Sequence, residues 1–252
     1  MNTHMPPSLS LVIPLYNETD RFPEGFSVCQ KLHATFPDWE FIFVNDGSED
    51  GTLTVVREAI TGFERMKLLS YKKNRGKGYA IKKGVLQAEK PFVLFSDIDF
   101  STPIKELEKL YACVSSGASL AIGTRKLNGA KIVKHQHFLR EWMGKQFTSL
   151  TNLWLGLLIS DYTCGFKLFK TEVARQIFKK QRIERWGFDA EILFLAHHYQ
   201  AKIKEVPICW QNDERTRVAI VKDSFRSLKD LYLIRWYYLT GKYNTRKKNL
   251  FA

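Results

Sequence analysis

The sequence is poor in cysteine and has no apolar run long enough to cross a bilayer. Its four cysteines, spread over 252 residues, form no C-x-x-C pair, so neither a disulfide framework nor structural zinc is expected. Residues 1–8 lack the apolar core of a signal peptide. The most apolar stretch, residues 150–159, contains polar residues and has about half the length of a transmembrane helix. We therefore expect a reduced, cytoplasmic protein that does not span a membrane by itself.

Common phosphate- and nucleic-acid-binding motifs are also missing. No G-x-x-x-x-G-K-[ST] occurs, and the glycines at 76 and 78 lack the third glycine of a dinucleotide fingerprint. The formal net charge of +13 nevertheless calls for an anionic partner. Residues 229–242 mix basic side chains with Tyr and Trp, which is typical of a membrane–water interface. Peripheral contact with an anionic membrane is therefore expected; a basic nucleic-acid-binding module is the distant alternative.

Short apolar runs alternate with amphipathic stretches through the first half of the chain. The pattern predicts strands over 9–14, 41–45, 67–71, 91–96 and 120–123, and helices over 22–36, 52–61, 77–87 and 104–115. Such alternation is typical of a mostly parallel sheet covered by helices on both faces. Later segments predict helices over 135–159, 188–199 and 224–238, and strands over 164–170 and 202–210. No linker is evident, so one domain over residues 1–252 is expected.

Two carboxylates, those of Asp97 and Asp99, directly follow the apolar run at 92–95. Residues two apart in extended backbone point to the same side, and open α/β sheets bind ligands at the carboxyl ends of their strands. Two like charges held so close need a cation, and hard oxygen ligands suit Mg²⁺ or Mn²⁺. The pair therefore predicts a divalent metal bound together with substrate phosphates.

Polar residues also follow the other predicted strands of the first half. Residues 14–18 end the first strand, residues 45–48 the second, and residues 75–78 lie after the third. Taken alone, 45–48 is an ordinary turn and 75–78 a solvated basic loop. Because parallel strands end at one edge of a sheet, their succession predicts a single site there.

Seven motifs occur in order along nearly the whole chain. They are VIPLYNE (12–18), NDGSEDGT (45–52), NRGKG (74–78), DIDFSTP (97–103), GTR (123–125), DYTCGFKLF (161–169) and RWGFDAE (185–191). Together they resemble the family 2 glycosyltransferases of the GT-A fold, in the polyprenyl-phosphate branch, and more its glucose-transferring than its mannose-transferring members. The resemblance implies an α/β fold with a mostly parallel nucleotide-binding sheet flanked by helices in residues 8–125. It implies an amphipathic helical acceptor half in residues 126–252.

The resemblance implies a nucleotide-sugar site at the strand ends. Asp97 would lie near the ribose and diphosphate, Asp99 would bind the metal directly, and Lys77 would lie near the phosphates. The implied nucleotide- and metal-binding residues are Pro14, Leu15, Tyr16, Glu18, Asn45, Asp46, Lys77, Gly78, Asp97, Ile98 and Asp99. The family usually has Asp-Asp-Gly-Ser at 45–48, so Asp46 is the remaining candidate to contact the base, and the effect of Asn45 on donor choice stays open.

A lipid phosphate would be an acceptor that needs cations rather than a base, since its second pKa is about 6 and it is already anionic at neutral pH. Arg125 and Arg140 match the family's acceptor-phosphate arginines, and a guanidinium suits phosphate oxygens. Asp161 would either orient the acceptor or act as a base.

Further residues of the second half are weaker candidates. Asp189 and Glu191 would bind sugar hydroxyls, and Lys167 and Arg217 would add phosphate contacts. For each acid, a helix cap or a core ion pair is the alternative.

The leading hypothesis is an inverting, metal-dependent transfer of a hexose, glucose from UDP-glucose, onto a polyprenyl phosphate. The enzyme would act peripherally on the cytoplasmic face of a membrane, directly or through a membrane-protein partner. The alternative is a glycan or protein hydroxyl acceptor, which would require Asp161 or Asp189 to act as a true base.

Overall fold

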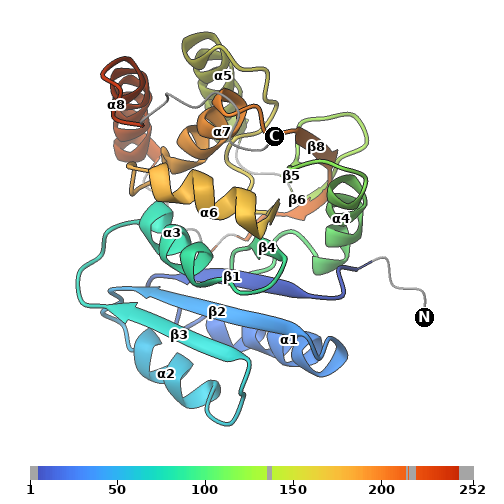
Figure 1. The fold of residues 1–252 in the computed structure, drawn as a ribbon. Coiled ribbons are helices and arrows are strands. Elements are labelled where there is room, and N and C mark those ends of the chain that lie inside the picture. The colour runs from blue at the N-terminus through green and yellow to red at the C-terminus, as the bar shows by residue number, and fades with distance from the viewer. Residues whose placement is uncertain (1–4, 135–137, 214, 216–219, 244–252) are drawn as a thin grey trace.

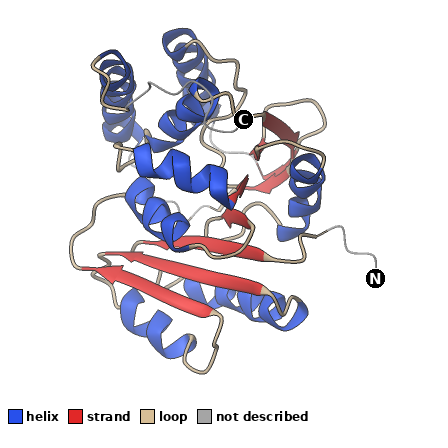
Figure 2. Ribbon diagram, viewed as in Figure 1, coloured by secondary structure: helices blue, strands red, loops and turns tan. Residues whose placement is uncertain are grey.

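The computed structural model describes residues 5–134, 138–213, 215 and 220–243, and in this part of the chain a seven-stranded sheet carries helices on both faces (Figure 1; Figure 2). The strand order is β3-β2-β1-β4-β7-β5-β8. Its strands are Leu9–Leu15 (β1), Trp39–Asp46 (β2), Met66–Tyr71 (β3), Phe92–Phe95 (β4), Leu120–Thr124 (β5), Lys167–Lys170 (β7) and Ile203–Pro207 (β8). A smaller sheet pairs Lys131–Lys134 (β6) with Cys209–Gln211 (β9).

Strand direction places six strand ends on one edge of the larger sheet. β7 runs antiparallel to its neighbours β4 and β5, and every other neighbouring pair in this sheet is parallel. β2 is buried along its whole length, which explains its nearly continuous apolar sequence. The segments that follow β1, β2, β3, β4, β5 and β8 therefore meet at a common carboxyl edge.

The helices form two layers over the sheet, each with its own core. They are Phe22–Thr35 (α1), Thr52–Ala59 (α2), Lys77–Gln87 (α3), Leu107–Ser115 (α4), Phe138–Leu155 (α5), Thr171–Lys180 (α6), Phe188–His198 (α7), Ile220–Leu239 (α8) and the 3₁₀ turn Ile104–Glu106 (η1). Side chains of α1, α2 and α4 fill the core on one face, and those of α3, α6 and α7 fill the core on the other. α5 and α8 pack outside α7 on that second face (Figure 1).

The predicted α/β fold with a mostly parallel sheet is confirmed, and most predicted elements are found within a few residues of their expected bounds. Two predictions differ. The strand expected over 202–210 is divided at Ile208 between β8 and β9, which belong to different sheets. β6 and α6 were not anticipated, although Val173, Ala174, Ile177 and Phe178 of α6 repeat at helical spacing and are buried. Residues 135–137 of the predicted 135–159 helix lie outside the described residues.

The two outer helices, α5 and α8, contact each other. The indole Nε1–H of Trp154 in α5 donates to the carbonyl of Leu231 in α8 at 3.1 Å and joins the two helices. Among the helices of the described ranges, none has the length and apolar character needed to cross a membrane.

Candidate active site

The centre of the candidate site is an ion pair between two of the predicted residues. Lys77 begins α3 and Asp97 follows β4, and Lys77 Nζ lies 2.5 Å from Asp97 Oδ1. The Asp97 side chain remains 43% exposed. Although burial opposes its charge, the carboxylates of Asp97 and Asp189 raise the pKa of Lys77, so it is a cation in the folded protein.

A glycine from the second half of the chain closes over this pair. A Cβ at Gly165 would lie 2.5 Å from Asp97 Oδ2 and 3.3 Å from Lys77 Nζ. A side chain at residue 165 would therefore displace the carboxylate from its present position. The sequence motif 161–169 contains this glycine, but spacing alone did not indicate its contact with Asp97.

Asp99 is paired with an arginine that the sequence analysis did not identify. Arg21 donates from Nη1 to Asp99 Oδ2 at 3.3 Å and from Nε to Glu18 Oε2 at 2.6 Å, and its Nη2 also pairs with Glu18. The backbone N–H of Ser101 donates to Asp99 Oδ1 at 2.9 Å. Burial and the neighbouring Asp97 charge raise the pKa of Asp99, and burial likewise raises the pKa of Glu18. The three-residue spacing of Glu18 and Arg21 is the signal that was available.

Asp46 organises the loop that precedes Lys77. Its carboxylate accepts hydrogen bonds from the backbone N–H of Arg75 at 2.8 Å, the backbone N–H of Gly76 at 2.7 Å and Asn74 Nδ2 at 2.9 Å. Asp46 is only 2% exposed. The structure thus assigns it the shaping of residues 74–76, and its contact with a base stays a prediction.

The remaining predicted nucleotide residues differ in what they expose. Tyr16 is 39% exposed beside the half-buried Pro14, whereas the side chains of Leu15 and Ile98 are buried in the core. Buried side chains leave only the backbone of these two residues for a ligand. The amide of Asn45 donates to Ser70 Oγ at 3.1 Å.

Gly78 contributes space rather than a side chain, because a Cβ there would lie 2.5 Å from Cβ of Phe188 in α7. This close approach packs the start of α3 against the start of α7. The two helix ends that carry Lys77 and Asp189 are brought together in this way.

The donor set at the carboxyl edge fits a divalent cation held jointly with phosphates. Among the described residues, no group of three or more His, Cys, Asp or Glu side chains is arranged to hold a metal. Mg²⁺ is bound in many sites by one or two carboxylates, with water and substrate phosphates completing its coordination. Asp97, 43% exposed, and Asp99, 12% exposed in the turn that follows β4, offer oxygen ligands of that kind.

Arg125 and Asp161 form a buried, bidentate pair. Arg125 Nε donates to Asp161 Oδ2 at 2.7 Å and Nη2 to Oδ1 at 2.9 Å, and Asp161 is fully buried. Although burial alone would raise it, the Arg125 guanidinium holds the pKa of Asp161 well below its usual range. Asp161 is therefore a weak proton acceptor that positions Arg125, and of the two roles left open by the sequence the geometry favours orientation.

Lys167 and Asp189 form a second buried pair, and the proposed phosphate contact of Lys167 is wrong. Its ammonium donates to the carbonyls of Tyr162 and Cys164 at 2.8 and 2.6 Å and to Asp189 Oδ1 at 2.6 Å. All three of its donors are thereby used, and the side chain is completely buried. Burial raises the pKa of Asp189, while Lys167 and Lys77 oppose that rise.

Glu191 does not reach the site, which corrects its proposed contact with sugar hydroxyls. Its carboxylate accepts from the backbone N–H of Arg182 at 2.9 Å, from that of Ile183 at 2.8 Å and from Tyr243 Oη at 2.7 Å. Asp189 and Glu191 are two apart in α7, and a helix turns about 200° over two residues. The two acids therefore lie on opposite sides of α7.

Two predicted acceptor-side arginines cannot be placed. Arg140 belongs to α5, but its side chain lies outside the described part, and Arg217 lies outside the described residues altogether.

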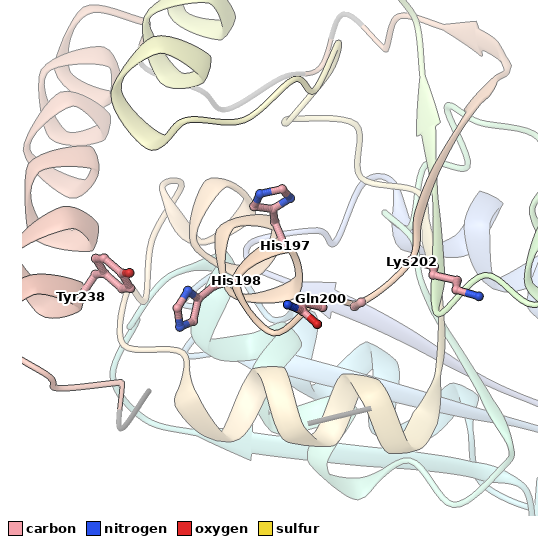
Figure 3. A pocket seen from close by; sticks show the side chains of 6 residues that line it. His197, His198, Gln200, Lys202 and Tyr238 are labelled. Atoms are coloured by element: carbon pink, nitrogen blue, oxygen red, sulfur yellow. The ribbon is translucent and has the colours of Figure 1, made fainter. Parts of the chain in front are cut away.

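A separate hollow lies at the other end of the sheet. Figure 3 shows His197, His198, Gln200, Lys202 and Tyr238 around it. Lys202 precedes β8, so this hollow is at the amino edge, opposite the strand ends that carry the acids. The ring of His198 packs on those of Phe194 and Tyr238.

The fold and the cluster of acids and cations at the carboxyl edge define a glycosyltransferase of the GT-A type. The chain belongs to glycosyl transferase family 2, whose sequence model matches residues 10–178. The dolichyl-phosphate beta-glucosyltransferase of Saccharomyces cerevisiae is 32% identical in an alignment of 262 positions, which covers 95% of this chain and 78% of the yeast enzyme. The Homo sapiens dolichyl-phosphate beta-glucosyltransferase is 31% identical in an alignment of 258 positions, which covers 96% of this chain and 80% of the human enzyme.

Solved structures show the same fold. A complex of Mycobacterium tuberculosis glucosyl-3-phosphoglycerate synthase with Mn²⁺, UDP-glucose and phosphoglyceric acid aligns with a TM-score of 0.64 at 15% identity, covering 90% of this chain and 79% of that chain. The family predicted from the motifs is thus confirmed, and the protein is a glycosyltransferase that uses a nucleotide sugar.

Proposed function

We propose that this enzyme transfers glucose from UDP-glucose to a polyprenyl phosphate and inverts the anomeric configuration. The observation that carries the proposal is the bidentate Arg125–Asp161 pair, which places a guanidinium at the acceptor side and leaves Asp161 a weak proton acceptor. The relatives named for dolichyl phosphate and glucose support the same choice of acceptor and sugar.

The donor would bind in the half formed by residues 8–125. Lys77, Asp97 and Asp99 would lie at the diphosphate, with Asp99 binding Mg²⁺ or Mn²⁺ directly. Such a cation, when bound, neutralises charge that develops on the departing diphosphate. Lys77 can supply a further positive charge there, since it is already a cation in the folded protein.

The acceptor would bind in the half formed by residues 126–252. A phosphate oxygen of the acceptor attacks the anomeric carbon, and the bond from that carbon to the β-phosphate oxygen of UDP breaks, with UDP taking the electron pair. A single displacement of this kind converts an α-linked donor into a β-linked lipid phosphate sugar. Arg125 would orient the attacking phosphate through Nη1, because Nε and Nη2 donate to Asp161, Nη2 also donates to Thr163 Oγ1 at 2.9 Å, and the guanidinium is thereby fixed in place.

A glycan or protein hydroxyl acceptor is the alternative, and Asp189 would then have to be the base. Burial raises the pKa of this carboxyl, as a base requires, but its Oδ1 is bound to Lys167.

Exposed apolar side chains on α5 and α8, and on the loop after α5, support contact of the acceptor half with a bilayer. They are Trp142, Leu150, Leu153, Trp154, Leu158, Leu228, Tyr232, Trp236 and Leu239. Lys145 and Lys229 are exposed on the same two helices, and aromatic and basic residues together are typical of an interfacial helix. We place the enzyme on the cytoplasmic face of a membrane, where an anionic surface attracts this basic chain; a membrane-protein partner is the other way to reach it.

Radiolabelled UDP-glucose with Mn²⁺ and either dolichyl phosphate or dolichol tests the reaction. Label should enter the organic phase with dolichyl phosphate only. Label transferred to dolichol as well would favour the hydroxyl alternative, and no transfer with UDP-glucose or any other common nucleotide sugar would refute the proposal.

Sedimentation with vesicles that contain or lack an anionic lipid tests the membrane contact. Leu158 is 93% exposed, so Leu158→Glu should weaken vesicle binding about tenfold without changing stability. Val133 in β6 is 65% exposed and lies off these helices, so Val133→Glu is the matched control and should bind as the wild type does. Equal binding by both variants would argue for a protein partner.

A further inference from the structure

The two carboxylates of the 97–99 motif each have a cation from the chain itself. Asp97 is paired with Lys77, and Asp99 with Arg21. A divalent cation that approaches without a nucleotide therefore meets carboxylates whose charge is already balanced in part. This arrangement makes binding of the metal alone costly.

The two contacts of Arg21 are unequal. It holds Glu18 through two nitrogens, with Nε at 2.6 Å from Glu18 Oε2, whereas a single 3.3 Å contact joins Nη1 to Asp99 Oδ2. Paired, short, charge-assisted hydrogen bonds are stronger than one long one. When a competing cation arrives, Arg21 will therefore keep Glu18 and release Asp99.

Asp99 keeps its orientation after such a release. The N–H of Ser101 donates to Asp99 Oδ1 at 2.9 Å, so Oδ2 is the oxygen that becomes available. Arg21 and Asp99 are both largely buried, with side chains 14% and 12% exposed, and the exchange takes place where solvent screens charge only weakly.

We propose that Arg21 is a positioning residue that occupies Asp99 while the donor is absent and yields it only when cation and diphosphate arrive together. The negatively charged diphosphate then replaces the two carboxylates as the partner of Arg21 and Lys77. Metal and nucleotide then bind cooperatively, and the metal alone binds weakly. The inference rests on the proposed function only in taking a nucleotide diphosphate and a divalent cation as the ligands.

Titration of Mn²⁺ followed by the electron paramagnetic resonance of the free ion tests this role without any turnover. Arg21→Met should bind Mn²⁺ alone about fivefold more tightly than the wild type, the size expected for loss of one partly screened ion pair. With saturating UDP the difference should shrink to within about twofold, because the diphosphate offers Arg21 an anionic partner in exchange for Asp99 when the metal binds. Arg57 in α2 is exposed, so Arg57→Met is the charge-matched control and should leave both affinities unchanged.

Arg21→Lys and Arg21→Gln are further variants in case Arg21→Met does not fold, and circular dichroism checks that each variant is folded. Lysine can pair with one carboxylate at a time, so its affinity for Mn²⁺ alone should lie between those of the wild type and Arg21→Met. An unchanged or weaker affinity of the folded Arg21 variants for Mn²⁺ alone would overturn the inference. If UDP bound to none of the proteins, the proposed function would fail, while the comparison with Mn²⁺ alone would still decide the role of Arg21.

Discussion

The donor and acceptor halves of the carboxyl edge hold their carboxylates in different ways. In the donor half, Asp97 is 43% exposed beside Lys77. In the acceptor half, Asp161 is fully buried in a bidentate pair with Arg125. A partly exposed pair can exchange its partner for a ligand at modest cost, whereas opening a buried pair leaves an uncompensated charge. The first arrangement suits groups that bind and release a nucleotide, and the second suits a fixed framework for the acceptor.

The largest effect should come from the exchangeable acids. Asp99→Asn should lower the transfer rate by about a thousandfold or more, because the group that binds the cation loses its charge. The midpoint of thermal unfolding should change little. Initial rates with UDP-glucose and dolichyl phosphate measure the first effect and circular dichroism the second. Asp20→Asn, at an exposed aspartate of the neighbouring loop, should keep full activity; retention of more than a tenth of the activity in Asp99→Asn would remove the metal argument.

Breaking the buried Arg125–Asp161 pair should instead lower the stability of the fold. Arg125→Met should lower the free energy of unfolding by about 3–5 kcal/mol, since it strands the Asp161 charge in the core. The double variant Arg125→Met, Asp161→Asn should recover part of that loss. Urea titrations measure both, and a loss below about 1 kcal/mol in the single variant would mean that the two kinds of pair do not differ.

Acidification tests the same pair. The folded-state pKa of Asp161 is depressed, so its stabilisation is present above the unfolded-state pKa of about 4 and is lost as the pH falls toward the folded value.

Gly165 lies where the two halves meet and should affect rate more than stability. Gly165→Ala brings a Cβ to 2.5 Å from Asp97 Oδ2, so the carboxylate that pairs with Lys77 must shift. Turnover should fall about a hundredfold, as expected when a catalytic group is misplaced by about 1 Å. A Cβ at Gly144 in α5 meets no atom within 4 Å, so Gly144→Ala should keep activity and gain about 1 kcal/mol of stability. Equal rates for the two variants would show that Asp97 tolerates displacement.

The smallest effect concerns Glu191, away from the site. Burial raises the pKa of Glu191 to about 7. Between the unfolded-state pKa of about 4.5 and 7 the folded protein binds one more proton than the unfolded chain, so the free energy of unfolding should fall as the pH rises, by at most about 1.4 kcal/mol per unit. Urea titrations from pH 4.5 to 7 should show this slope reduced in Glu191→Gln and kept in the exposed control Glu64→Gln. A slope unchanged in Glu191→Gln would place the titration elsewhere.

The donor half could be predicted from the sequence because its signals are local. Apolar runs mark β1, β2, β3 and β4, and parallel pairing then brings the residues after them to one edge. Asp97 and Lys77 were expected together and lie 2.5 Å apart. Arg21 was missed because no periodicity links it to Asp99, which lies 78 residues away.

The acceptor half was less predictable because its ion pairs are buried in the core. Lys167 was expected to contact a phosphate, but the carbonyls of Tyr162 and Cys164 and the carboxylate of Asp189 hold it in the interior. Glu191 looked like a neighbour of Asp189, but the helical turn of α7 points it the other way. Spacing along a sequence does not reveal burial or the partner that permits it.

The most direct test of the central claim is the anomalous diffraction of Mn²⁺ in crystals grown with UDP. The account predicts the metal at the Asp99 carboxylate and in contact with the diphosphate, with Lys77 turned toward a phosphate oxygen. Nucleotide and metal bound away from residues 46, 77, 97 and 99 would contradict it.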